Sequence, residues 1–183
     1  MLCTSLNEQV VHGIPSAKTV LRDGDILSVD CGVVIDGFYG DSAITIPVGK
    51  VAAETQRLLD VTKASLEMAI DTVRPGAMLG DVGAAVQEMV EAEGFSVVKE
   101  FVGHGIGTHM HEDPQIPNFG QRGRGVRLRE GMVLAIEPMV NAGGDAVRVL
   151  KDGWTAVTED GSLSAHFEHT VAVTKDGAAI LTL

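Results

Sequence analysis

A ten-residue pattern that occurs twice constrains this fold more than any other feature of the chain. Residues 21–30 read LRDGDILSVD, and residues 128–137 read LREGMVLAIE. Both begin with Leu-Arg, an acid and Gly, and both continue as an apolar run that ends in an acid, Asp30 or Glu137. The run predicts a buried β-strand, and a buried carboxylate without a partner is costly. The same cost at the same place twice indicates that positive charge faces both acids.

A second pattern follows each of these segments. Asp41 begins DSAITIP and Glu168 begins EHTVAVT, and each acid precedes a small residue and alternating Ile or Val. Two patterns in the same order indicate a duplicated half-domain whose halves each supply two strands and two acids. A single strand acid usually faces solvent, but four acids placed by a repeated pattern favour a shared function.

The first two acids are predicted to share one face of the sheet. Asp-Gly at residues 36–37, between β-prone residues, is typical of a two-residue hairpin turn. Counting back from this turn places Gly32 opposite Asp41. Asp30 would then be diagonal to Asp41, with the two α-carbons about 7–8 Å apart. A one-residue bulge would instead put the acids on opposite faces.

Three of the six histidines, His104, His109 and His111, lie within eight residues of a glycine-rich segment. Imidazole binds transition metals and transfers protons. The spacing matches no zinc-finger or HExxH pattern, and a lone histidine in such a loop usually only makes its own hydrogen bonds. With four strand acids available, we expect at least one of the three to bind a metal.

This set of ligands predicts a reaction class. Four carboxylates and one imidazole are too many for a closed tetrahedral zinc site. They suit two adjacent ions about 3.5–4 Å apart, which hold a hydroxide between them and polarise a carbonyl or phosphoryl oxygen. The residues therefore favour a hydrolase.

Length and composition place the chain among globular proteins. Its 183 residues are 45% hydrophobic and 21% charged, which suits one substantial domain and excludes a disordered or fibrous chain. Residues 54–73 and 79–90 have helical spacing, and most of the rest alternates strands and turns, so the class is α+β. A net charge of −11 argues against nucleic acid and anionic membrane as main partners. With two cysteines, no membrane-spanning apolar run and no secretory signal, we expect a cytoplasmic protein.

Seven short motifs, in order, resemble those of the type I methionine aminopeptidases, and the match covers the chain from Cys3 onward. They are HGIP at 12–15, VDCG at 29–32, DGFYGD at 36–41, GHGIG at 103–107, IEPMVNAG at 136–143, KDGWT at 151–155 and FEHT at 167–170.

The resemblance implies a pita-bread fold, in which two pseudo-symmetric halves with antiparallel sheets surround a two-metal centre. It implies a single catalytic domain over residues 1–183, with halves at about 1–50 and 51–183. The helices that precede the first half in the family have no counterpart here, and a homo-oligomer would cover the sheet that they leave open.

The implied activity removes the initiator methionine from the N-terminus of nascent peptides. A water or hydroxide bridging two divalent ions (cobalt, manganese, iron, zinc or nickel) would attack the peptide. By similarity, the metal ligands are Asp30, Asp41, His104, Glu137 and Glu168.

The same resemblance assigns roles around the metals. Glu137 would help to move a proton from the bridging water, His111 would contact the scissile peptide, and His12 would lie near the substrate amide. Cys3, Met110 and Trp154 match positions that line the methionine pocket, and a thioether suits such a polarizable lining. A purely structural role is the alternative for three of them: His12 could order the entry to a strand, Trp154 could be a core residue and Met110 could pack locally.

Two further kinds of function stay open at this point. One is a related Xaa-Pro peptidase of the same fold, and another is a truncated, weakly active or non-catalytic binding relative. RNA binding through GQRGRG at 120–125 is disfavoured by the net charge, although a transient contact with the ribosome is compatible with processing of nascent chains.

Overall fold

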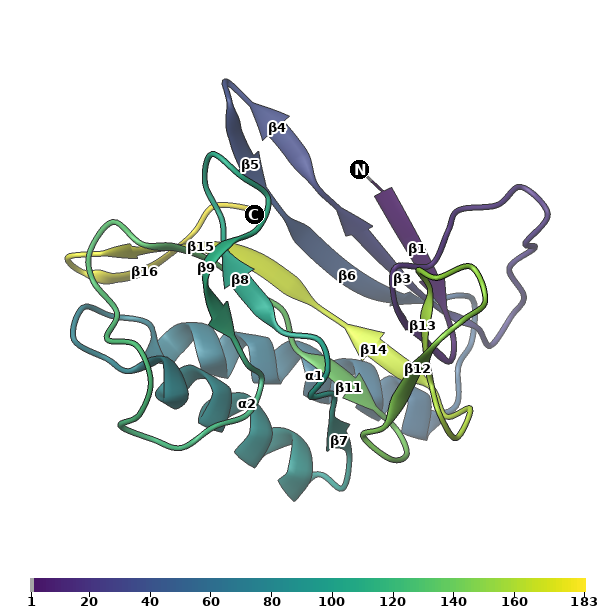
Figure 1. Ribbon diagram of the computed structural model, residues 1–183. Coiled ribbons are helices and arrows are strands. Elements are labelled where there is room, and N and C mark those ends of the chain that lie inside the picture. The colour runs from purple at the N-terminus through teal and green to yellow at the C-terminus, as the bar shows by residue number, and fades with distance from the viewer. Residues whose placement is uncertain (1) are drawn as a thin grey trace.

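The computed structural model describes residues 2–183, which form a curved antiparallel sheet with both helices on one side of it (Figure 1). The helices are α1 (Ala53–Thr72) and α2 (Leu79–Ala92). The strands are β1 (Leu2–Leu6), β2 (Gln9–Val11), β3 (Ile26–Cys31), β4 (Val33–Ile35), β5 (Phe38–Gly40), β6 (Ser42–Pro47), β7 (Ser96–Val97), β8 (Gly103–Gly105), β9 (Glu112–Ile116), β10 (Val133–Ile136), β11 (Met139–Asn141), β12 (Val147–Val149), β13 (Ala156–Thr158), β14 (Ser164–His166), β15 (Glu168–Thr174) and β16 (Gly177–Ile180).

The repeated segments occupy the centre of the main sheet, whose order is β1-β3-β6-β15-β10-β8-β9, with β16 added to β15. The first pattern gives β3 and β10, and the second gives β6 and β15. In each half, the strand of the second pattern lies nearer the middle of the sheet than the strand of the first pattern. The two strands of the second pattern, β6 and β15, are therefore neighbours. Ser42 pairs with His169 and Ala43 with Glu168 at this junction, so one sheet runs through both halves.

The helices agree with the predicted spans to within about two residues. Their apolar faces pack on the second half of the sheet in one core, which includes Leu58, Leu66 and Val86 from the helices. The core also contains Leu134 of β10 and Val171 of β15. The strand that precedes Glu137 and the strand that begins at Glu168 therefore share one core with both helices. No helix among residues 2–183 is long and apolar enough to cross a membrane.

The first half of the sheet has no helix over its outer face in the part of the chain described. Leu2 of β1 is 51% exposed, and Ile44 and Ile46 of β6 are 51% and 41% exposed. Ile44 and Ile46 alternate with buried residues along β6, as expected of a strand with one solvent-facing side. This open face agrees with the α+β pita-bread class without covering helices on the first half.

The predicted hairpin is confirmed. The turn at residues 36–37 has positive φ at both positions, as a tight turn between β4 and β5 requires. In the neighbouring β3–β6 pairing, Asp30 lies opposite Ala43. The same offset places Gly32 opposite Asp41 and makes Asp30 and Asp41 diagonal neighbours, so the bulged alternative is wrong.

Candidate metal centre

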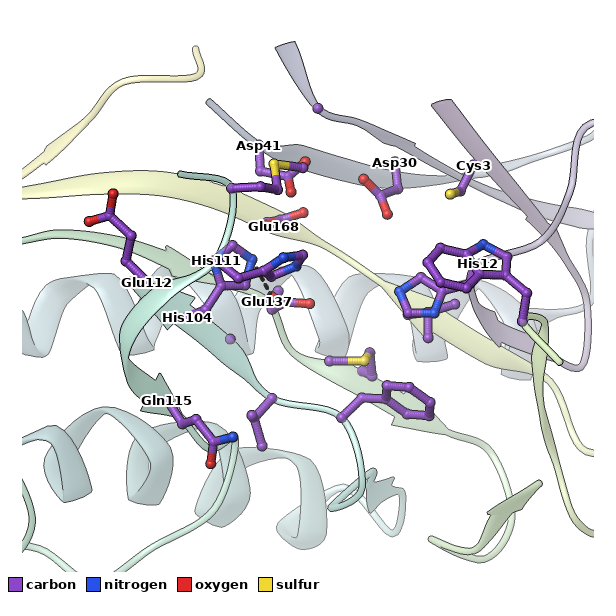
Figure 2. Close-up of a pocket in the computed structure, with 18 of the residues that line it drawn as sticks. Cys3, His12, Asp30, Asp41, His104, His111, Glu112, Gln115, Glu137 and Glu168 are labelled. Carbon is purple, nitrogen blue, oxygen red and sulfur yellow. Dashed lines mark ion pairs between the residues drawn. The ribbon is translucent and has the colours of Figure 1, made fainter. Parts of the chain in front are cut away.

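A cavity of about 560 Å³ opens between the two halves of the sheet. Every site residue predicted from the sequence lines it. These ten residues are Cys3, His12, Asp30, Asp41, His104, Met110, His111, Glu137, Trp154 and Glu168. Figure 2 shows Asp30, Asp41 and Glu168 directed toward the space beside His104 and Glu137.

Three of the predicted metal ligands form the tightest group. One ligand atom each from Asp41, His104 and Glu168 lies within 4.8 Å of the others, and all three residues are buried. Asp41 directly precedes β6, Glu168 begins β15, and His104 is the middle residue of β8. Backbone pairing within one sheet thus brings together residues that are far apart in the sequence.

The glycines beside His104 explain how β8 fits between its neighbours. A Cβ atom at Gly103 would lie 2.3 Å from the carbonyl oxygen of Ala135, and one at Gly105 would lie 2.2 Å from that of Asp113. Only glycine permits this approach of β8 to β10 and β9. The His104 ring donates from Nδ1 to the Gly105 carbonyl at 2.9 Å, because a carbonyl can only accept. In the neutral ring Nε2 then keeps its lone pair, the form in which histidine binds metals.

Glu137 lies directly after β10, where the Asn118 amide donates to its carbonyl at 2.9 Å. Its Oε1 is 3.5 Å from Nε2 of His104. Both atoms offer lone pairs, and so does Oε1 of Glu168, which is buried without a hydrogen-bond partner among residues 2–183. Ionised acceptors gathered without donors are costly when buried, and either bound protons or a cation would stabilise them.

Burial also changes the acidity of these groups. Desolvation raises the pKa of Glu137 to about 8, with His104 lowering it and Asp30 raising it. Desolvation likewise raises the pKa of Glu168 well above its ordinary value, and nearby Glu137 adds to this. Without a counter-charge these carboxyls hold protons, and a divalent cation would displace them. The side chains that could bind a metal therefore fit a divalent metal centre.

Asp30 stands slightly apart from the tight group. Burial raises its pKa, and a hydrogen bond with Asp41 adds to the rise. Burial raises the pKa of Asp41 as well. Asp41 is also fixed to the second half, because its backbone N–H donates to the Thr170 hydroxyl at 2.9 Å and that hydroxyl donates back to its carbonyl at 2.8 Å. The five predicted ligands thus form one cluster, with Asp30 at its edge.

His12 lies at the other end of the cavity, in an aromatic setting. Its ring stacks on Trp154 at 4.8 Å between centroids and meets the Phe101 ring edge-on at 5.6 Å. Burial lowers the pKa of His12, which favours the neutral ring. Trp154 is 48% exposed, so the alternative of a core tryptophan is wrong.

The histidine segment divides between the cavity and solvent. The exposed His111 lies over His104, with ring centroids 4.4 Å apart, whereas His109 does not line the cavity. The neighbouring Met110 enters it, and a Cβ atom at Gly32 would lie 2.4 Å from the Met110 terminal methyl. Gly32 thus leaves space for this thioether beside the acids.

Three side chains of this region, among others that line the cavity, were not predicted from the sequence. Phe101 and Met139 extend the apolar lining, and nothing in their sequence context singles them out. His166 was also missed, although its Nε2 is 3.6 Å from Oε2 of Glu137. Its signal was available, because it precedes Glu168 by two residues, the spacing that directs two strand side chains to one face.

Comparison with known proteins agrees with this geometry. The model of metallopeptidase family M24 matches residues 1–175. Methionine aminopeptidase A of Synechocystis is 53% identical over 182 residues, which is 100% of this chain and 72% of that protein. The solved structure of the Thermotoga maritima methionine aminopeptidase superposes with a TM-score of 0.98 at 55% identity, covering 99% of this chain and 73% of that one.

More distant structures share the fold alone. The prolidase of Pyrococcus horikoshii superposes with a TM-score of 0.76 at 22% identity, covering 100% of this chain and 47% of that one. The methionine aminopeptidases are 53% and 55% identical to this chain, whereas the prolidase is 22% identical. The chain belongs to metallopeptidase family M24 and, within it, to the methionine aminopeptidases.

Proposed function

We propose that this chain is a type I methionine aminopeptidase that uses two divalent metal ions to remove methionine from the N-termini of peptides. The observation that carries the proposal is the buried group of Asp41, His104 and Glu168, whose ligand atoms lie within 4.8 Å of one another at the floor of the cavity. Relatives at 53% identity carry this activity in their names.

The metal ligands would be Asp30, Asp41, His104, Glu137 and Glu168. When bound, divalent ions polarise a peptide carbonyl and lower the pKa of water in the site. Every other step belongs to side chains of the protein, which bind the peptide, exclude water and move protons.

The apolar and the polar side chains of the cavity suit the two parts of the substrate. Cys3, Met110 and Trp154, with Phe101 and Met139, offer sulfur and aromatic surfaces to a flexible thioether side chain. The acids would hold the free amine and the scissile bond. This arrangement selects a peptide that begins with methionine.

Proton transfer would rest on Glu137 and the two cavity histidines. The Glu137 carboxylate would take a proton from the attacking water and deliver it to the departing amine. His111, exposed above His104, is free to contact the scissile peptide and its tetrahedral intermediate. His12, held between Trp154 and Phe101, would bind the substrate amide.

The test is a metal-reconstituted assay with Met-Gly-Met, run beside a Xaa-Pro peptide. Methionine release from Met-Gly-Met is expected, with little cleavage of the Xaa-Pro peptide. Glu137→Ala should reduce turnover by about 10²–10⁴-fold, the usual contribution of a positioned acid–base group, while the circular dichroism spectrum is unchanged. Turnover by Glu137→Ala close to that of the unmutated protein would contradict the role, and preferential Xaa-Pro cleavage would favour the alternative peptidase.

The proposed setting is the cytoplasm, where the substrate is the N-terminus of a nascent chain. A transient ribosome contact through residues 120–125 has weak support, because Arg122 is paired with Glu88 of α2. Arg124 lies in the same glycine-rich loop, whose Gly123 N–H donates to Asp81 of α2 at 2.7 Å. This loop is tied to the protein, which disfavours a role as a free basic tail. A homo-oligomer through the open sheet face is a further part of the proposal, and native mass spectrometry would test it.

A further inference from the structure

His166 is a buried histidine whose position the surrounding backbone fixes. It ends β14, and it is 2% exposed. The Thr45 hydroxyl of β6 accepts from the His166 N–H at 2.8 Å and donates to the His166 carbonyl at 2.7 Å. Since that hydroxyl has only one proton, Ser28 donates the third bond, at 2.7 Å. Two strands of the first half therefore anchor this residue of the second.

The ring of His166 is directed at the carboxylate of Glu137. Its Nε2 lies 3.6 Å from Oε2 and has no hydrogen-bond partner among residues 2–183. On the other side of the carboxylate, Oε1 faces Nε2 of His104 at 3.5 Å. Glu137 thus lies between two imidazoles, one on each oxygen.

The two imidazoles differ in the hydrogen that they can offer. His104 uses its Nδ1 hydrogen on the Gly105 carbonyl, so its Nε2 presents a lone pair to Oε1. A second lone pair facing Oε2 would repel an ionised carboxylate, which is the form that binds metal. With Glu137 ionised, Nε2 of His166 would therefore carry the hydrogen, and the 3.6 Å separation would have to shorten to make a hydrogen bond.

We propose that His166 is a positioning residue, which holds Oε2 of Glu137 through an Nε2–H hydrogen bond and so turns the carboxylate toward the metal ions and the substrate. The inference rests on the proposed metal-dependent function. A core histidine with no role would be expected to make its own hydrogen bonds, and this one makes none through Nε2 in the described chain. Hydrogen-bonded partners of ligands commonly change metal affinity or activity by about 10–100-fold.

The experiment compares His166→Gln, His166→Asn and His166→Leu with the unmutated protein. A glutamine amide reaches to about the place of the histidine Nε2, whereas an asparagine amide falls short and leucine donates nothing. The readouts are Co²⁺ affinity by calorimetry, the Co²⁺ visible absorption spectrum, and kcat and KM on Met-Gly-Met. His109→Gln is the matched control, because His109 is exposed and does not line the cavity.

Asparagine and leucine are expected to weaken Co²⁺ binding or lower kcat by about 10–100-fold, and to alter the Co²⁺ spectrum. Glutamine should restore values close to those of the unmutated protein, with KM unchanged throughout. Thermal unfolding of each variant checks the fold. If leucine prevents folding, the polar pair of glutamine and asparagine still decides the question.

Three results would overturn the role of His166. The variants could all match the unmutated protein, glutamine could fail as badly as asparagine, or asparagine could reduce the number of Co²⁺ ions bound at saturation, which would make His166 a ligand. If even the unmutated protein cleaves no methionyl peptide, the proposed function fails. The Co²⁺ affinities and spectra would still test the contact between His166 and Glu137.

Discussion

At the scale of single residues, this site is defined by a carboxylate that is largely shielded from water, with 13% of its side chain exposed. Glu137 directly follows the apolar strand β10, and burial raises its pKa to about 8. An imidazole lies near each of its oxygens. The surrounding protein supplies few hydrogen-bond donors to the acids of this site, so a bound cation would stabilise their ionised form. Substitution of a residue that binds this cation should therefore weaken metal binding, whereas substitution of a residue outside the ligand set should not.

His104 and His109 allow this comparison within one segment. Its Nδ1 hydrogen bond to Gly105 prepares Nε2 to bind a metal, so His104→Ala should weaken Co²⁺ binding by at least about 10-fold. His109→Ala, a change on an exposed ring of the same segment, should leave Co²⁺ binding unchanged. Elemental analysis after dialysis against a metal buffer measures both. Equal metal content in His104→Ala and the unmutated protein would remove His104 from the ligand set.

At the scale of elements, glycines decide how closely the strands approach. The backbone of β8 passes so near β10 that a Cβ atom at Gly103 would lie 2.3 Å from a backbone oxygen. Backbone atoms cannot move away as a flexible side chain can. The position of His104 between β10 and β9 therefore depends on the absence of two methyl groups beside it.

Gly103→Ala should for this reason lower the free energy of unfolding by about 1–3 kcal/mol and also weaken metal binding. Gly40→Ala is the control, because a Cβ atom there would meet only the Val33 side chain, at an ordinary 3.7 Å. Urea unfolding of the metal-free proteins measures the first effect, and calorimetry with Co²⁺ the second. Equal losses in both variants would show that the backbone contact at Gly103 is unimportant.

The same elements show what sequence could predict. Helical spacing gave both helices, and Asp-Gly at residues 36–37 gave the hairpin register, because these signals are local. The repeated acids gave the cluster, since a duplicated pattern implies a duplicated position. The pairing of β6 with β15 could not be predicted, because it joins segments far apart in the chain. The spacing of His166 from Glu168 was visible in the sequence, but its contact with Glu137 was not, because Glu137 follows a strand that is distant in the chain.

At the scale of the whole molecule, the cluster couples stability to pH. The folded-state pKa values of Asp30, Asp41, Glu137 and Glu168 are all raised, mainly by burial. These four carboxyls therefore bind more protons in the folded protein than in the unfolded chain. Their stabilising contribution is complete below the ordinary carboxyl pKa and is lost as pH rises through the folded values, for Glu137 between 4.5 and about 8.

The melting temperature of the metal-free protein should consequently fall as pH rises from 6.5 to about 8, because the lowered pKa values of His12, His166 and His169 act in the opposite direction only below their ordinary value of 6.5. Each carboxyl contributes at most about 1.4 kcal/mol per pH unit. Added Co²⁺ should raise the melting temperature more at the upper end of the range than at the lower end, because metal competes with protons for the same oxygens. Differential scanning fluorimetry with and without a chelator measures this. A metal-free protein that becomes more stable toward pH 8 would contradict the burial of the cluster.

The junction of the two halves has a mechanical consequence. Only two backbone residue pairs join β6 to β15, yet Asp41 and Glu168 lie on opposite sides of that seam and contribute to the same group of ligand atoms. An ion held by both residues would add a link across this seam to those that the backbone already makes, such as the pairing of β2 with β13 and the bonds between Thr45 and His166. Metal loading would therefore also strengthen the cohesion of the two halves, along the line where catalysis takes place.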